Sequence, residues 1–263
     1  MALDPLQALQ AAQRPLSPAA AGPGGTLLIA GATGTLGNEL VRRLAGAHRY
    51  AHTRVLAREP MQDGLRGIET VLLPPGTDGS DASSMQHWPR IQADVALVCF
   101  DPPRLYHDRE RALWTPTPEQ LPQLARWLRE CGVRTLAVVQ PHAQGRLPEA
   151  LKRGLASMDE QSVAALGFER LLLVRSAQKP VDAKKGSAPQ RLAAWMLSVA
   201  RFMVPASEQP VRAAVVAQFV DAALRLAPLG THVAAPELVW QAAQGQAEPV
   251  VRAWLRGTAP VEP

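Results

Sequence analysis

Short apolar runs alternate with amphipathic segments along much of the chain. Apolar runs typical of buried strands lie at residues 26–30, 53–57, 71–73, 94–100, 134–139 and 170–174. Between them, apolar residues recur at helical spacing over residues 35–46, 118–131 and 149–166. Strands that are apolar on both faces and alternate with helices are typical of parallel sheets covered on both sides. The pattern therefore predicts an α/β fold with a doubly wound, mainly parallel sheet.

The pattern changes after residue 175. The remaining chain predicts a polar loop, two amphipathic helices, and a strand followed by a helix, at residues 178–190, 191–204, 211–227 and 232–244. We interpret residues 176–263 as a small helical cap within a single domain that spans residues 26–263. Residues 1–25 are rich in Ala, Pro, Gln and Gly, a composition typical of a flexible arm.

A glycine-rich turn follows the first apolar run and opens the first helix. Three glycines have the spacing GxxGxxG in the sequence Gly31-Ala32-Thr33-Gly34-Thr35-Leu36-Gly37. Such glycines allow a tight turn and let the backbone approach a diphosphate, which the N–H groups and dipole of the helix N-terminus then bind. The context of strand, turn, helix and second strand predicts a dinucleotide-binding Rossmann unit. The expected cofactor-binding residues are Gly31, Thr33, Gly34, Thr35, Leu36 and Gly37.

The end of the second strand bears on the choice of cofactor. Arg58 lies about 20 residues after the glycine turn, where an acid would bind the ribose 2′-hydroxyl of NAD and an arginine would accommodate the 2′-phosphate of NADP. Arg58 therefore favours NADP, while the neighbouring Glu59 keeps NAD as the alternative.

Three sequence pieces resemble the atypical branch of the short-chain dehydrogenase/reductase superfamily. They are the glycine turn, Val55-Leu56-Ala57-Arg58, and the segment from Ala165 to Arg175, which is similar to the branch that contains the Tat-interacting oxidoreductase. The resemblance runs from about Leu27 to Trp240 and implies NAD(P) binding on a Rossmann fold.

The same resemblance implies catalytic residues that this chain lacks. The family places a serine at the end of the fifth strand and a Tyr-x-x-x-Lys pair on the next helix, where the tyrosine transfers a proton. Here Gln140 and Pro141 stand in place of the serine, Lys152 in place of the tyrosine and Ala156 in place of the lysine. No Tyr-x-x-x-Lys exists anywhere, because Arg54 follows Tyr50 and Glu110 follows Tyr106 at that spacing.

Two strand ends also depart from the family pattern. The third strand ends in Leu73-Pro74-Pro75, where an acid would face the adenine. The fourth ends in Phe100-Asp101-Pro102-Pro103, where small residues would lie under the nicotinamide. We expect the diphosphate end of the site to be kept and the nicotinamide end to be rebuilt.

Few other residues are candidates for chemistry. His142, after the fifth strand, and Lys152 are the candidates for substituted proton transfer. His48 and His52 have a metal-ligand spacing, but Gly46 interrupts their helix and no acid is near in sequence, so no metal site is expected. We interpret residues 106–110 as a solvated charged face rather than as acid–base groups.

Composition limits the classes of function. Lys and Arg exceed Asp and Glu by five over 263 residues, but they form no long run, which argues against a nucleic-acid partner. No apolar stretch is long enough to span a membrane, and the N-terminus lacks the pattern of a secretory signal. The two cysteines, Cys99 and Cys131, form no metal-binding motif. We expect a cytoplasmic protein.

Three hypotheses follow for function. The first is an NAD(P)-binding protein without standard reductase catalysis, acting as a binding, sensing or scaffold subunit. The second is an active NAD(P)H-dependent oxidoreductase with substituted acid–base residues. The third is an interaction module whose glycine turn is vestigial. The helices of the cap are the expected surface for a protein partner or a second copy.

Overall fold

A computed structural model describes most of the chain. The described residues are 24–61, 67–74, 85, 87–104, 107–142, 155, 157–177 and 211–257. The expected arm at residues 1–25, except residues 24 and 25, and the expected helix at 191–204 therefore lie outside the described residues.

The predicted parallel sheet is confirmed, with seven strands in the order β3-β2-β1-β4-β5-β6-β7. Every neighbouring pair is parallel. The strands are β1 Thr26–Ala30, β2 His52–Ala57, β3 Glu69–Leu72, β4 Val95–Cys99, β5 Thr135–His142, β6 Arg170–Ala177 and β7 Gly230–Ala234. The order reverses direction between β1 and β4, and such a switch point is where ligands bind in open α/β sheets.

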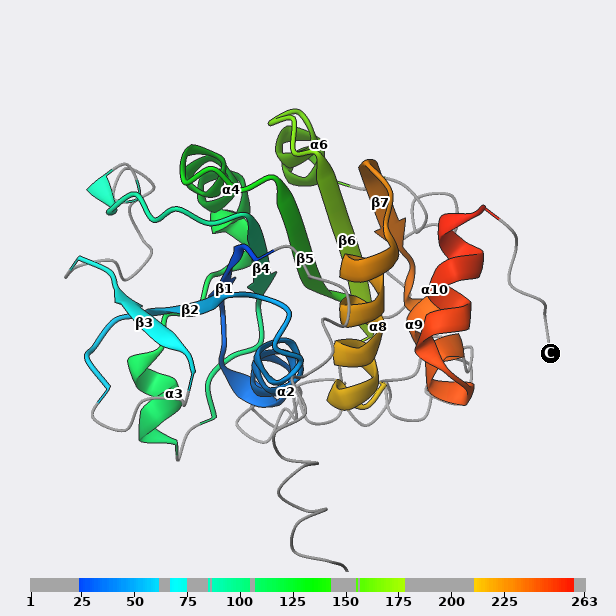
Figure 1. Ribbon diagram of the computed structural model, residues 1–263, viewed down its shortest axis with the longest axis horizontal. Coiled ribbons are helices and arrows are strands. Elements are labelled where there is room, and N and C mark those ends of the chain that lie inside the picture. The colour runs from blue at the N-terminus through cyan, green and yellow to red at the C-terminus, as the bar shows by residue number, and fades with distance from the viewer. Residues whose placement is uncertain are drawn as a thin grey trace, which may run out of the picture.

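Helices cover both faces of the sheet, as Figure 1 shows. One face packs against α2 (Gly34–Gly46), α8 (Ala213–Leu226), α9 (Pro236–Gln244) and α10 (Ala247–Leu255). The other packs against α4 (Leu121–Glu130) and α6 (Met158–Ala164). The central strands are buried on both faces, which explains why they read as continuous apolar runs.

The C-terminal region contributes one strand and three helices to the described fold. Residues 230–234 form β7, which pairs with β6 and extends the sheet. Helix α8 packs beside α2, where buried Asp221 forms ion pairs with Arg43 and Arg49. Within the described ranges, no helix is long and apolar enough to cross a membrane.

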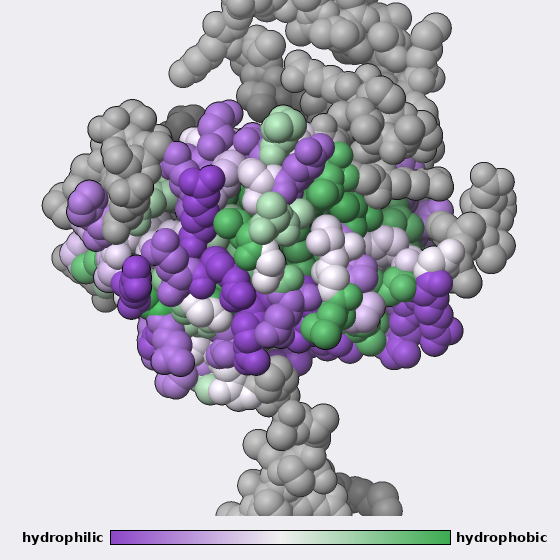
Figure 2. Space-filling model, turned by 90° about the horizontal axis from the view of Figure 1, so that it is seen from above, coloured by the Kyte–Doolittle hydropathy of each residue, from purple (hydrophilic) through white to green (hydrophobic). Residues whose placement is uncertain are grey.

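The two edges of the sheet have different surfaces. Figure 2 looks onto the edge where the strands begin and shows hydrophilic side chains interspersed with smaller apolar areas. Ion pairs such as Arg134–Asp94 and Arg54–Glu69 lie near these strand starts. At the opposite edge lie the strand ends, the first turn of α2 and the short helix α3 (Asp108–Ala112), which precedes the 3₁₀ turn η2 (Pro118–Gln120) (Figure 1). The candidate site is at this second edge.

Candidate functional site

The glycine turn has the backbone geometry that the sequence predicts. Gly31 and Gly34 have φ angles of +83° and +66°, in the left-handed region that favours glycine. A β-carbon at Gly37 would lie 2.5 Å from the Gly31 carbonyl oxygen, so the third glycine lets α2 pack closely on the turn. The first turn of α2 therefore presents its N–H groups at the carboxyl edge of β1.

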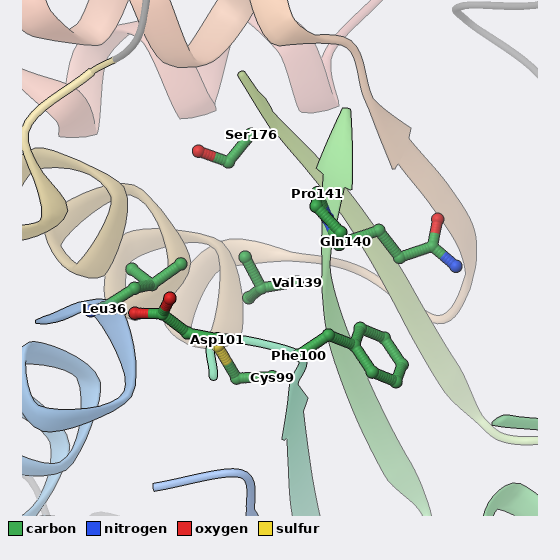
Figure 3. Close-up of a pocket in the computed structure, with 8 residues that line it drawn as sticks. All are labelled: Leu36, Cys99, Phe100, Asp101, Val139, Gln140, Pro141 and Ser176. Carbon is green, nitrogen blue, oxygen red and sulfur yellow. Dashed lines mark hydrogen bonds between the residues drawn. The ribbon is translucent and has the colours of Figure 1, made fainter. Parts of the chain in front are cut away.

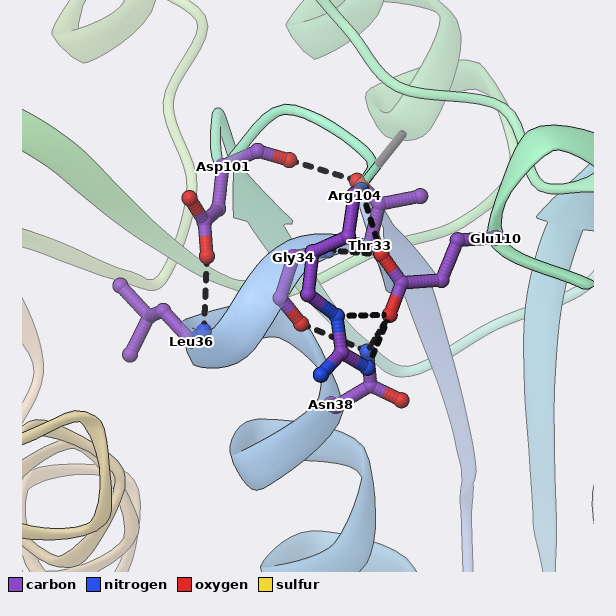
Figure 4. Close-up of polar contacts among 7 residues, drawn as sticks. All are labelled: Thr33, Gly34, Leu36, Asn38, Asp101, Arg104 and Glu110. Carbon is purple, nitrogen blue, oxygen red and sulfur yellow. Dashed lines mark hydrogen bonds and ion pairs between the residues drawn. The ribbon is translucent and has the colours of Figure 1, made fainter. Parts of the chain in front are cut away.

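Two carboxylates of the same chain already bind these N–H groups. The Leu36 N–H donates to Oδ2 of Asp101, with 2.7 Å between nitrogen and oxygen. The Gly34 N–H donates to Oε2 of Glu110 at 3.0 Å. Figure 4 shows the two side chains reaching the start of α2 from the chain that follows β4. The turn is thus an anion site that accepts carboxylate oxygens, and it is occupied from within the chain.

Glu110 is the more deeply buried of the two acids, with 3% of its surface exposed. Its Oε1 accepts hydrogen bonds from Asn38 Nδ2 at 2.8 Å and from Arg104 Nε at 2.7 Å, and its Oε2 accepts from the Arg104 backbone N–H. Burial raises the pKa of Glu110, but the bonds from Arg104 and Gly34 outweigh burial and hold that pKa below its usual range. The sequence-based interpretation of residues 106–110 as a solvated face is wrong for Glu110, because α3 turns this side chain inward toward α2.

The backbone and the side chain of Asp101 both accept hydrogen bonds from the region of the glycine turn. The Thr33 hydroxyl donates to the Asp101 carbonyl oxygen at 2.6 Å and lies 2.9 Å from the Thr115 hydroxyl. Burial raises the pKa of the Asp101 carboxyl, and the Leu36 N–H offsets part of that rise. The family resemblance placed residues 100–103 under the nicotinamide, but the Asp101 carboxylate reaches the glycine turn instead.

The chain that follows α3 crosses the ends of β1 and β2. The Trp114 N–H donates to the Leu56 carbonyl oxygen at 3.0 Å, and the Gly31 N–H donates to the Trp114 carbonyl oxygen at 3.2 Å. Arg58 directly follows β2, and its backbone N–H donates to the Ala112 carbonyl oxygen at 2.7 Å. Arg58, which the sequence predicts as a cofactor residue, is an exposed residue at this strand end.

A small hollow lies beside this turn, at the ends of β4, β5 and β6. It is lined by Leu36, Cys99, Phe100, Asp101, Val139, Gln140, Pro141 and Ser176. Figure 3 shows Asp101, Leu36, Val139 and Ser176 toward one side, while Gln140 and Phe100 point away. Its volume of about 20 Å³ suits a single water molecule, far below the several hundred Å³ of typical ligand pockets. Among the described residues, this hollow is therefore too small to hold a nicotinamide ring.

The structure offers no tyrosine for standard proton transfer among the residues it describes. Tyr50 lies between α2 and β2, at the edge where the strands begin, and burial raises the pKa of its phenol. The backbone of His142 ends β5 and pairs in register with Ala177 of β6, at the same edge as the glycine turn. The His142 side chain, Tyr106, Lys152 and Ala156 lie outside what the structure describes. Cys99 is buried, and burial raises the pKa of its thiol to about 12.

The two histidines with metal-ligand spacing lie on either side of the connection between α2 and β2. His48 has a positive φ of 49° after α2 ends, and His52 Nδ1 lies 3.1 Å from Oε1 of Glu69 on the neighbouring strand. No group of three metal-ligating side chains occurs in the part of the chain that the structure describes.

Sequence reasoning placed Asp101 at the nicotinamide end rather than at the glycine turn, and it missed Arg104 and Glu110. For Asp101 a signal was present, because it directly follows a buried strand and so had to lie at the carboxyl edge. For Glu110 the local sequence is charged throughout, and only the tertiary contact with α2 distinguishes it from its neighbours.

No protein-family model and no curated protein matches this chain. Among solved structures, a nucleoside-diphosphate-sugar epimerase from Staphylococcus aureus has a TM-score of 0.46 and 13% identity, covering 90% of this chain and 92% of that one. A triphenylmethane reductase from Citrobacter sp., complexed with NADP(H), has a TM-score of 0.46 and 14% identity, covering 78% of this chain and 68% of that one. An enzyme of Bordetella bronchiseptica in complex with NAD+ has a TM-score of 0.42 and 12% identity, covering 86% of this chain and 82% of that one. With values this low, these likenesses carry no inference about activity.

Proposed function

We propose that this chain binds a nicotinamide dinucleotide and does not catalyse standard hydride transfer, so that it acts as a binding, sensing or scaffold subunit. In this proposal it is a member of the atypical short-chain dehydrogenase/reductase type, similar to the Tat-interacting oxidoreductase branch. The observation that carries the proposal is the first turn of α2. Its Leu36 N–H binds a carboxylate oxygen at 2.7 Å, at the switch point of the sheet where a diphosphate would bind.

The choice of NADP rests on Arg58. Arg58 follows the last residue of β2 and is an exposed residue. A guanidinium binds a phosphate through two parallel hydrogen bonds. Glu59 is exposed beside it and would favour the ribose hydroxyl of NAD, so both cofactors belong in the binding assay.

The absence of standard catalysis rests on the sequence. No Tyr-x-x-x-Lys pair exists among the 263 residues, and the position expected for the serine holds Gln140 or Pro141. Proton transfer by such a group contributes about 10²–10⁴-fold to a rate, so its loss removes most of the expected activity.

Titration of the full chain with NADPH and NADH in a calorimeter tests binding, and a panel of carbonyl compounds tests turnover. We expect NADPH to bind and no carbonyl compound to be reduced.

The variant Gly34→Asp should abolish binding, because it adds a carboxylate at the turn. Its melting temperature reports whether it folds. Turnover that His142→Ala or Lys152→Ala eliminates would establish a substituted active site instead. Absence of binding to both cofactors would leave the interaction module as the function.

A further inference from the structure

The residues between β4 and η2 combine an anchored part and an exposed part. The anchored part contains Trp114, which is 1% exposed and packs edge-on against Trp88 with 5.0 Å between ring centroids. Leu113 forms an antiparallel bridge with Ala57 at the end of β2. We name the exposed part the closing segment. It comprises the described residues 101–104 and 107–111, most of which are exposed to solvent.

The closing segment contacts α2 mainly through its two acids. Asp101 accepts from the Leu36 N–H, and Glu110 accepts from the Gly34 N–H and from Asn38. A β-carbon on Gly34 would lie only 2.3 Å from the Asp101 carboxyl, so this carboxylate lies directly over the turn. An anionic diphosphate and these carboxylates therefore need the same N–H groups and the same space.

We infer that the closing segment is an autoinhibitory device, in which Asp101 and Glu110 substitute for the diphosphate and a dinucleotide binds only by displacing them. This inference rests on the proposed function, since it describes how access to that site is regulated.

Glu110 can leave the turn without losing its counter-ion. Arg104 belongs to the same segment and binds both Glu110 oxygens through its side chain and its backbone N–H. The pair therefore moves as a unit, and no buried charge is stranded when the segment lifts. Asp101 forms no ion pair in the contacts described. Burial raises the pKa of its carboxyl, and the Leu36 N–H and the charge of Arg104 offset only part of that rise. Both features make the closed arrangement displaceable.

Charge-removing variants test this device. Asp101→Asn and Glu110→Gln keep the shape of each side chain and remove its negative charge, so the double variant should bind NADPH about tenfold more tightly than the wild type. Asp108→Asn is the matched control, because Asp108 lies on the same helix, is exposed, and pairs only with Arg111 among its described contacts. It should leave the dissociation constant unchanged. The single variant Asp101→Asn provides the same test if the double variant does not fold.

Amide hydrogen exchange gives a readout that does not depend on a cofactor. Exchange at Gly34 and Leu36 should be faster in the double variant than in the wild type, because both N–H groups lose a charged acceptor. Equal NADPH affinity in wild type and variants would overturn the autoinhibitory device and leave the proposed function intact. Absence of NADPH binding in the wild type and in every variant would overturn both.

Discussion

A β-carbon at Gly34 would lie 2.3 Å from the carboxyl carbon of Asp101 and 2.8 Å from the Pro102 carbonyl oxygen. The glycine is therefore required twice, by its own positive φ and by the chain that crosses above it. In the closed arrangement the turn and the segment after β4 are therefore in close contact.

Substitution of Gly34 should report this fit. Gly34→Ala forces an L-residue to φ +66°, which costs about 1–2 kcal/mol, and its methyl group displaces Asp101. We expect the free energy of unfolding in urea to fall by about 1–3 kcal/mol. Gly46→Ala is the control, because it ends the same helix and its β-carbon would meet nothing within 4 Å. Equal stability of the two variants would contradict the close fit.

A second prediction concerns cofactor choice. Arg58→Ala should weaken NADPH binding about tenfold or more and leave NADH binding almost unchanged, because only NADPH carries a 2′-phosphate. Calorimetric titration with both cofactors measures the ratio. Arg54→Ala is the control on the same strand, since Arg54 pairs with Glu69 near the opposite edge of the sheet. Parallel losses for both cofactors in Arg58→Ala would remove this residue from the specificity argument.

A third prediction concerns acid stability. The folded-state pKa of Glu110 lies below its usual value, so the stability it contributes is present above a pH of about 4.3 and is lost as pH falls through the folded pKa. At neutral pH, Glu110→Gln should lower the free energy of unfolding by about 1–3 kcal/mol. Below that range the difference between wild type and variant should shrink. A difference that is constant from pH 7 to pH 3 would show that the carboxylate charge contributes nothing.

The sheet was predictable because its strands follow a simple physical rule. A strand buried on both faces, such as residues 26–30, must be apolar throughout, and the run ends at the glycine turn. The N-terminal part of the site followed from the same reasoning, because Gly31 and Gly34 need positive φ angles whatever binds there. These features depend on residues close in sequence.

The occupant of the turn was not predictable in this way. Glu110 and Gly34 are separated by 76 residues, and nothing in the charged run around Glu110 indicates which side chain is buried. Helix α3 is also too short to show helical periodicity. Helix α10, which packs against α8, was also not predicted, although Ala247, Val251 and Trp254 have helical spacing.

A last prediction concerns how α2 is held in place. Asp221 of α8 is 3% exposed and pairs with Arg43 Nε at 3.2 Å, with Arg49 and, more distantly, with Arg225. In the described contacts, these three arginines share the Asp221 carboxylate, and Asp221→Ala removes it. Removing one partner of a buried ion pair lowers the free energy of unfolding by up to about 3–5 kcal/mol. Because the arginines are partly exposed, we expect urea denaturation to show a decrease of about 1–3 kcal/mol.

The control for this variant is Glu248→Ala. Glu248 pairs with Arg225 and Arg252 on the surface, where solvent screens the charges, and its removal should change stability little. Asp221→Ala should also speed amide hydrogen exchange along α2 beyond Leu36. The preference for NADPH over NADH should stay unchanged, because the glycine turn lies at the N-terminus of α2, away from Arg43. Equal effects of the two substitutions would show that α8 holds α2 by apolar packing, through residues such as Val220 and Leu40, and that the buried ion pairs are incidental.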